Sequence, residues 1–151
     1  MDLILWRHAE AEEGDPDLAR TLTSKGRKQA ARMAEYLLQR LPAKFTVLAS
    51  PAARAQQTAE ALAARIKTVD KLAPGAAVSD ILQAANWPDG DGVVLVVGHQ
   101  PDLGAVVAHL LSGSRDESWS IKKGALWWLR NSSRDEAEQI VVRAVVSPEL
   151  L

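Results

Sequence analysis

The chain has 151 residues, 47% of them hydrophobic, which is enough for one domain with its own core and excludes a disordered chain. Its formal net charge of −1 gives no global electrostatic reason to expect a nucleic-acid or membrane partner. Cysteine is absent, so disulfides and thiolate metal sites are excluded.

The first third of the chain alternates apolar runs with an amphipathic stretch. Residues 3–6 and 45–49 form unbroken apolar runs, which are typical of strands buried on both faces of a parallel sheet. Between them, apolar residues recur at helical spacing over 30–41, with charged residues on the opposite face. This pattern predicts a helix, and Thr23 or Ser24 can cap its start.

The alternation continues to about residue 113. A second helix is expected to begin after Ser50 and Pro51 and to reach Leu62, and a weaker third helix is expected over 76–85. The run "VVLVV" at 93–97 predicts another buried strand, and a fourth helix should follow over 101–113. Alternating strands and helices predict an α/β fold with right-handed crossovers.

The tail has a different pattern. The apolar segments 125–129 and 139–146 flank a polar stretch at 130–138, which predicts a hairpin-like pair at the edge of the sheet. No internal repeat or linker interrupts the sequence. We therefore expect a single three-layer α/β domain over 1–151, with a mostly parallel central sheet, helices on both faces and a C-terminal antiparallel edge pair.

Arginine and histidine side chains follow three of the predicted strands. Arg7 and His8 come directly after the first apolar run. Arg54 lies shortly after the second run, and His99 follows the third. Because the carboxyl ends of parallel strands face the ligand crevice, these four residues are expected to meet.

Two arginines and two histidines suit a phosphoryl group. Guanidinium groups offer paired donors to the phosphoryl oxygens, and the helix after Ser50 could add backbone N–H groups. One histidine could attack phosphorus while the other stabilises charge or carries a proton. The nearby positive charges should lower the histidine pKa values and keep a ring nitrogen free at neutral pH. Each residue alone could be an ordinary polar loop residue, so the prediction depends on the set.

Four sequence blocks occur in a recognisable order. They are "LWRHAEA" from Leu5, "RTLTSKGRKQA" from Arg20, "LASPAARAQQTAEAL" from Leu48 and "VVLVVGHQPDLGAVVAHLL" from Val93. Together they resemble the histidine phosphatase superfamily, the phosphoglycerate mutase-like group, and most closely its short SixA-type phosphohistidine phosphatases. The resemblance covers essentially the whole chain and implies a phosphoglycerate mutase-like fold.

The resemblance also implies roles for the residues in these blocks. It implies a phosphatase without metal or cofactor, in which His8 is the nucleophile and is transiently phosphorylated. It places Arg7, Arg54 and His99 around the transferred phosphoryl group, and Arg20 at the rim of the pocket.

A general acid is harder to find. Larger relatives usually supply a carboxylic acid from the segment after the second helix, yet no glutamate occurs over 61–116. Four other carboxylic acids are candidates for the general acid, and the sequence does not single one out: Glu10, Glu12, Asp15 and Asp80. An alkoxide leaving group needs protonation, whereas a phosphohistidine leaves as an imidazole that can already carry its proton.

These features predict a protein phosphohistidine phosphatase. We expect its partner to be a phosphohistidine-bearing protein, such as a histidine-containing phosphotransfer domain, with no nucleic-acid or membrane partner. The apolar run before Arg7 is too short for a signal peptide, so a cytoplasmic location is expected. The alternatives are a phosphatase of small phosphorylated molecules, a non-catalytic module that binds phosphate or a phosphoprotein, and a metal hydrolase. Two histidines without an evident third ligand make the metal hydrolase the weakest alternative.

Overall fold

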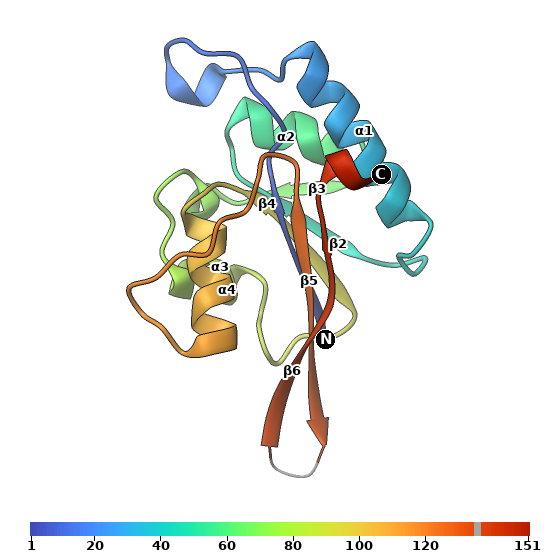
Figure 1. Cartoon of the computed structure of the whole chain (residues 1–151), viewed down its shortest axis with the longest axis vertical. Helices are drawn as coiled ribbons and strands as arrows, with labels where there is room; N and C mark the ends of the chain where they lie inside the picture. The colour runs from blue at the N-terminus through green and yellow to red at the C-terminus, as the bar shows by residue number, and fades with distance from the viewer. Residues whose placement is uncertain (135–136) are drawn as a thin grey trace.

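The computed structural model describes residues 1–134 and 137–151 (Figure 1). Its strands are β1 (Asp2–Arg7), β2 (Thr46–Ala49), β3 (Ile66–Thr68), β4 (Val93–Gly98), β5 (Leu126–Arg134) and β6 (Ala137–Val146). Within the described residues they form one sheet in the order β3-β2-β4-β1-β5-β6. The pairs β3–β2, β2–β4 and β4–β1 are parallel, while β5 is antiparallel to both β1 and β6. The predicted mostly parallel sheet with a C-terminal antiparallel pair is confirmed.

Helices cover both faces of the sheet, as Figure 1 shows. They are α1 (Ser24–Leu38), α2 (Ala53–Glu60), α3 (Val78–Ala84) and α4 (Asp102–Ser112), with short 3₁₀ turns η1 (Asp17–Ala19), η2 (Asp70–Leu72) and η3 (Pro148–Leu150). In the described part of the chain, α1 and α2 pack together on one face and α3 and α4 on the other. None of the helices in these residues has the length and apolar character needed to cross a bilayer.

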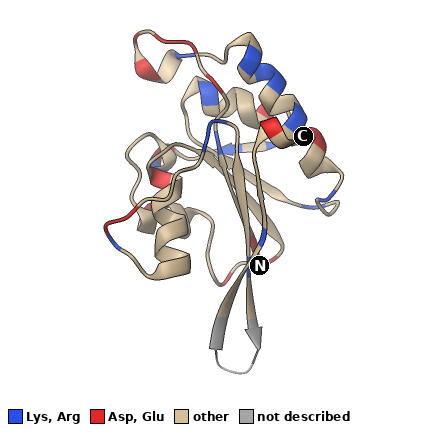
Figure 2. Cartoon of the chain, viewed as in Figure 1, with Lys and Arg blue, Asp and Glu red and all other residues tan. Residues whose placement is uncertain are grey.

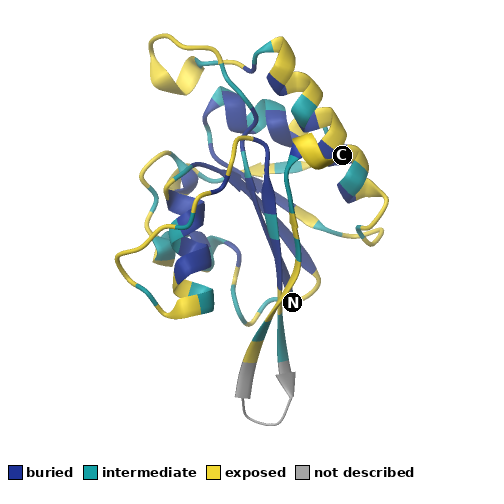
Figure 3. Ribbon diagram, in the orientation of Figure 1, coloured by how far each residue is buried: buried dark blue, intermediate teal, exposed yellow. Residues whose placement is uncertain are grey.

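The alternation of side chains along β1 explains the two halves of the core. Ile4 and Trp6 point to the α1 and α2 side, and Leu3 and Leu5 point to the α3 and α4 side. All four side chains are fully buried, which Figure 3 shows as the dark strands at the centre of the molecule. A strand buried on both faces has an unbroken apolar sequence, and "LILW" is such a sequence.

Several boundaries differ from the sequence predictions. β3 was not predicted, because its three residues "IKT" form no apolar run. α1 ends at Leu38, three residues before the predicted end, while Thr23 caps it as expected, its Oγ1 accepting from the Gly26 N–H at 2.9 Å. α2 begins at Ala53, close to the predicted start after Pro51, and ends at Glu60 rather than at Leu62.

The predicted turn over 130–138 is largely wrong. β5 continues to Arg134 and β6 begins at Ala137, because backbone pairing extends the ladder through polar residues. Of the predicted turn, Asp135 and Glu136 lie outside the described residues.

The register of the parallel strands brings their carboxyl ends to one edge of the sheet. Arg7 is paired with Gly98, and Ala49 with Val97. The backbone ladder continues one step beyond the strands, where the His8 N–H donates to the Gly98 carbonyl at 3.0 Å. The Ser50 N–H donates to the Val97 carbonyl at the same distance. The residues that follow β1, β2 and β4 are therefore held side by side.

Candidate active site

His8 is fixed by its backbone and by its ring. Only 7% of the residue is exposed, and its ring Nδ1 lies 2.7 Å from the Ala9 carbonyl oxygen. A carbonyl oxygen only accepts, so Nδ1 carries the proton and Nε2 keeps a free lone pair. The next residue is also fixed, since the Ala9 N–H donates to Thr58 Oγ1 on α2 at 3.0 Å. This contact ties the loop after β1 to the helix that carries Arg54.

His99 lies against His8, with the two ring centroids 5.3 Å apart. Arg54 Nη2 is 3.4 Å from His99 Nδ1, and a guanidinium only donates, so His99 Nδ1 is the acceptor. The proton of His99 is then on Nε2, which donates to Ser50 Oγ at 2.7 Å. Ser50 was expected just before α2, but the N-cap of α2 is Ala52, and the Ser50 side chain instead orients the second histidine.

Both histidines are uncharged at neutral pH. Burial lowers the pKa of His8 to about 4, against the hydrogen bond to Ala9, and the charges of Arg54 and Arg7 act in the same direction as burial. Burial lowers the pKa of His99 to about 3, supported by the neighbouring His8 and Arg54. The free Nε2 of His8 is therefore available as a nucleophile at pH 7.

The two predicted arginines approach the histidines from different elements. Arg54, in the first turn of α2, is only 3% exposed. The half-buried Arg7 donates from Nη1 to the Ile121 carbonyl oxygen at 2.8 Å. In the described residues, the Nε atoms of both side chains are buried and make no hydrogen bond. Buried guanidinium donors of this kind are suited to an anion that completes their hydrogen bonds.

Asp17 is a site residue that the sequence reasoning missed. Its Oδ2 accepts from Arg54 Nη2 at 3.1 Å, its carbonyl oxygen accepts from Arg54 Nη1 at 2.8 Å, and its Oδ1 accepts from Arg20 Nε at 3.0 Å. The bond from Arg54 holds the pKa of the Asp17 carboxyl below its usual range, so the group is ionised at pH 7. The available signal was the three-residue spacing of Asp17 and Arg20 in the acidic loop.

A cavity of about 280 Å³ opens over these groups. Its lining contains the predicted residues Arg7, His8, Arg20, Arg54 and His99. It also contains four residues that were not predicted, which are Ala11, Pro74, Gln100 and Lys123. No carboxylic acid lines it among the described residues, so Glu10, Glu12, Asp15 and Asp80 all lie outside the lining. The Glu10 carboxylate instead accepts from Thr23 Oγ1 at 2.8 Å.

The described side chains do not form a metal site. In residues 1–134 and 137–151, no group of three or more histidine, aspartate or glutamate side chains is arranged to hold a metal ion. The cavity combines positive charge with two neutral imidazoles, and this is the chemistry of a site that binds and transfers a phosphoryl group.

The fold and the site thus define a protein that handles phosphoryl groups, and comparison with known proteins identifies the family. Residues 3–74 match the histidine phosphatase superfamily (branch 1). An uncharacterized protein of Picosynechococcus sp. is 33% identical over 148 residues, with 88% of this chain and 87% of that protein covered. The chain belongs to the histidine phosphatase superfamily and is of the SixA type.

Two solved SixA structures support this placement. A SixA protein from Nakamurella multipartitia is 29% identical, with a TM-score of 0.78 over 97% of this chain and 95% of that chain. The structure of the protein histidine phosphatase SixA complexed with tungstate is 26% identical, with a TM-score of 0.79 over 99% of both chains. The family and these neighbours support a phosphatase.

Proposed function

We propose that this protein is a phosphohistidine phosphatase that acts on a phosphoprotein and forms a covalent intermediate on His8. The observation that carries the proposal is the composition of the cavity, which has two neutral histidines and several cations in its lining but no carboxylic acid among the described residues. The similar SixA structure holds tungstate, a tetrahedral oxyanion of the same shape as phosphate.

The reaction consists of two displacements at phosphorus. In the first, the lone pair of His8 Nε2 forms a bond to phosphorus, and the P–N bond of the substrate breaks with its electron pair going to the departing imidazole. Arg7 and Arg54 donate to the phosphoryl oxygens as charge spreads over them. In the second, the oxygen of a water molecule forms a bond to phosphorus, and the P–N bond breaks with its electron pair returning to His8 Nε2. The protons of the water leave with inorganic phosphate or pass to solvent.

The leaving group explains why a carboxylic acid is not needed. An imidazole titrates near pH 6.5, so a phosphohistidine can already be protonated on its other ring nitrogen near neutral pH. It then departs as a neutral imidazole. An alcohol departs as an alkoxide unless an acid protonates it, and none of the candidate acids in the described chain reaches the cavity. The same cavity should hydrolyse phosphate monoesters slowly.

The proposal extends to cofactors, partner and location. We propose that turnover needs neither metal nor cofactor, because the charge of the phosphoryl group is met by Arg7, Arg54 and the rim residue Arg20. The proposed partner is a phosphohistidine-bearing protein, and the proposed location is the cytoplasm.

A substrate comparison tests the proposal. Wild type, His8→Ala and the matched control His109→Ala, which changes an exposed histidine of α4, are incubated in chelator with a phosphohistidine-bearing carrier protein and a panel of monoesters. We expect wild type and His109→Ala to release phosphate from the phosphoprotein, and His8→Ala to release none. Faster turnover of a sugar phosphate or nucleotide would show that the substrate is a small molecule. Binding without any turnover would show a non-catalytic module, and loss of activity in chelator would show a metal hydrolase.

A further inference from the structure

The outer face of α1 is strongly basic although the whole chain is nearly neutral. Figure 2 marks several positions along this helix as Lys or Arg, in blue. Lys25, Lys28 and Arg32 are exposed, and none of them forms an ion pair with another described residue. Unpaired exposed cations concentrated on one helix create a local positive potential that attracts an acidic surface.

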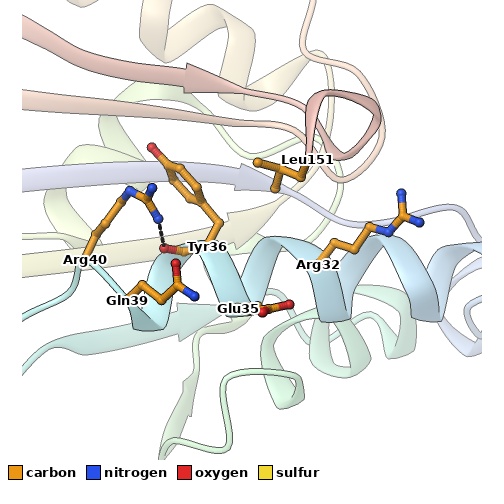
Figure 4. Close-up of a pocket in the computed structure, with 6 residues that line it drawn as sticks. All are labelled: Arg32, Glu35, Tyr36, Gln39, Arg40 and Leu151. Carbon is orange, nitrogen blue, oxygen red and sulfur yellow. Dashed lines mark hydrogen bonds between the residues drawn. The ribbon is translucent and has the colours of Figure 1, made fainter.

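Two hollows along this face share lining residues with each other and with the catalytic cavity. The first, of about 310 Å³, is lined by Lys25, Lys28, Gln29, Arg32, Lys123, Pro148 and Glu149. Lys123 also lines the catalytic cavity, so the first hollow and that cavity lie on either side of one side chain. The second hollow, of about 380 Å³, shares Arg32 with the first and continues past Tyr36 to Arg40 (Figure 4). We name these two joined hollows the α1 groove.

The α1 groove is also connected to the loop that carries the nucleophile. Gln29, in its lining, accepts at Oε1 from the Glu10 N–H at 3.0 Å, two residues beyond His8. A partner bound in the α1 groove would therefore lie beside the entrance to the catalytic cavity. The shared Lys123 and the hydrogen bond of Gln29 distinguish the groove from a basic patch remote from the cavity.

The chemistry of the α1 groove matches a protein surface. Tyr36 and Leu151 add apolar atoms to its far end, where Arg40 lies over the Tyr36 ring at 3.9 Å. Two carboxylates interrupt the cations: Glu35, and Glu149, whose Oε1 is already paired with Lys122 Nζ at 3.1 Å. A nucleic acid would bring its phosphates against these carboxylates, whereas a protein face can place acidic, polar and apolar side chains in turn.

From these contacts we infer that the α1 groove docks the acidic face of the protein whose phosphohistidine enters the catalytic cavity. The inference rests on the proposed function and adds the surface that selects its substrate. Docking increases the encounter rate and the affinity for the phosphoprotein but does not touch the reacting atoms. Its signature is a change in KM without a change in kcat.

A charge-reversal pair tests the inference. The variant Lys28→Glu/Arg32→Glu changes two groove residues that do not line the catalytic cavity. The control Lys44→Glu/Lys67→Glu makes the same change in charge at exposed sites before β2 and on β3, neither of which lines the groove. Turnover is measured with an acidic histidine-containing phosphotransfer domain phosphorylated by phosphoramidate, and with free phosphohistidine. Thermal melting confirms that both variants are folded.

We expect the groove variant to raise KM for the phosphorylated domain about tenfold and to leave kcat unchanged. It should turn over free phosphohistidine as wild type does. Its KM for the domain should also depend less on salt concentration. The control variant should match wild type. An unchanged KM in the groove variant, while wild type is active on the domain, would overturn the docking surface and leave the proposed function intact. If wild type is inactive on the domain and on free phosphohistidine, the proposed function fails and the docking inference fails with it. Binding of an RNA oligonucleotide that only the groove variant loses would overturn the inference in favour of a nucleic-acid partner.

Discussion

The two ends of β1 both hold buried charge, but they hold it in different ways. At the amino end, Asp2 is 4% exposed, and its carboxylate accepts from Trp128 Nε1, Arg130 Nε and Arg143 Nη1 at 2.6–2.9 Å. Burial raises the pKa of this carboxyl, but these three donors outweigh burial and hold the pKa below its usual range. The charge at this end is balanced within the protein.

The carboxyl end of the same strand is not balanced. Arg7 and Arg54 each have a buried Nε without a partner among the described residues, and the only carboxylate in contact with them is that of Asp17, on Arg54. The adjacent His8 and His99 are kept neutral. The charge at the amino end is met by internal donors, whereas the carboxyl end has guanidinium donors without such partners, an arrangement suited to an anion.

Among the charged residues at the two ends of β1, the largest effect should come from Arg54. Replacing it by alanine removes donors to the phosphoryl group, and we expect kcat to fall on the order of a hundredfold or more. Arg7→Ala should have a similar effect, and Arg54→Lys should recover only part of the activity because it lacks the paired donors. Steady-state kinetics with phosphohistidine measure the loss. The matched variant Arg130→Ala removes an arginine from the other end of β1 and should turn over like wild type; an equal loss there would erase the distinction between the two ends.

A change at Asp2, at the amino end of β1, should affect stability only. Asp2→Asn leaves three donors around an uncharged group, and we expect the free energy of unfolding to fall by about 2 kcal/mol, because Asp2 is buried while its arginine partners are partly exposed. Urea denaturation measures this loss, and Asp91→Asn, at an exposed position, is the control. A strong decrease in kcat with unchanged stability would contradict the structural role of Asp2.

The neutral histidines should make the protein sensitive to acid. A group whose pKa is lower in the folded state than in the unfolded state binds more protons when unfolded, so stability decreases as the pH falls from about 6.5 toward about 4. From pH 7 to pH 5.5, we expect His8 to contribute a loss of about 1 kcal/mol. Urea denaturation at both pH values should show a smaller difference for His8→Ala than for wild type. An equal difference in the two proteins would place the acid sensitivity elsewhere.

The smallest effect is expected at Asp17, whose side chain is 56% exposed. Asp17→Asn removes a negative charge beside Arg54 and Arg20, so inorganic phosphate should inhibit two- to fivefold more strongly, roughly the effect of one partly screened charge. The inhibition constant of phosphate measures the change, and Asp70→Asn is the matched control. Weaker inhibition would mean that positioning of the arginines by Asp17 outweighs its charge.

Much of this arrangement could be predicted because it depends on local patterns. The unbroken run "LILW" predicts a strand buried on both faces, and the carboxyl ends of such strands share one edge of a sheet. The meeting of His8, Arg54 and His99 followed from these two facts. The resemblance to the superfamily added the expected roles of these residues, and those roles stay predictions until they are measured.

The parts that could not be predicted depend on contacts between distant segments. Arg7 is held by the carbonyl of Ile121, and Lys123 reaches the cavity from the same segment. That segment lies close to α4 because Gly104 has no side chain, and a Cβ there would overlap the Trp119 carbonyl oxygen. No local sequence pattern reports an approach of this kind. β3 was missed for a similar reason, since its pairing with β2 rather than its sequence makes it a strand.

The central claim is that His8 accepts the phosphoryl group, and trapping the intermediate tests it most directly. Wild-type protein is mixed rapidly with radiolabelled phosphohistidine protein, quenched in alkali and digested, and the labelled peptide is sequenced by mass spectrometry. The account predicts an acid-labile, alkali-stable label on the peptide that contains His8, formed before phosphate release and absent in His8→Ala. A label on His99, or continued turnover by His8→Ala, would contradict it.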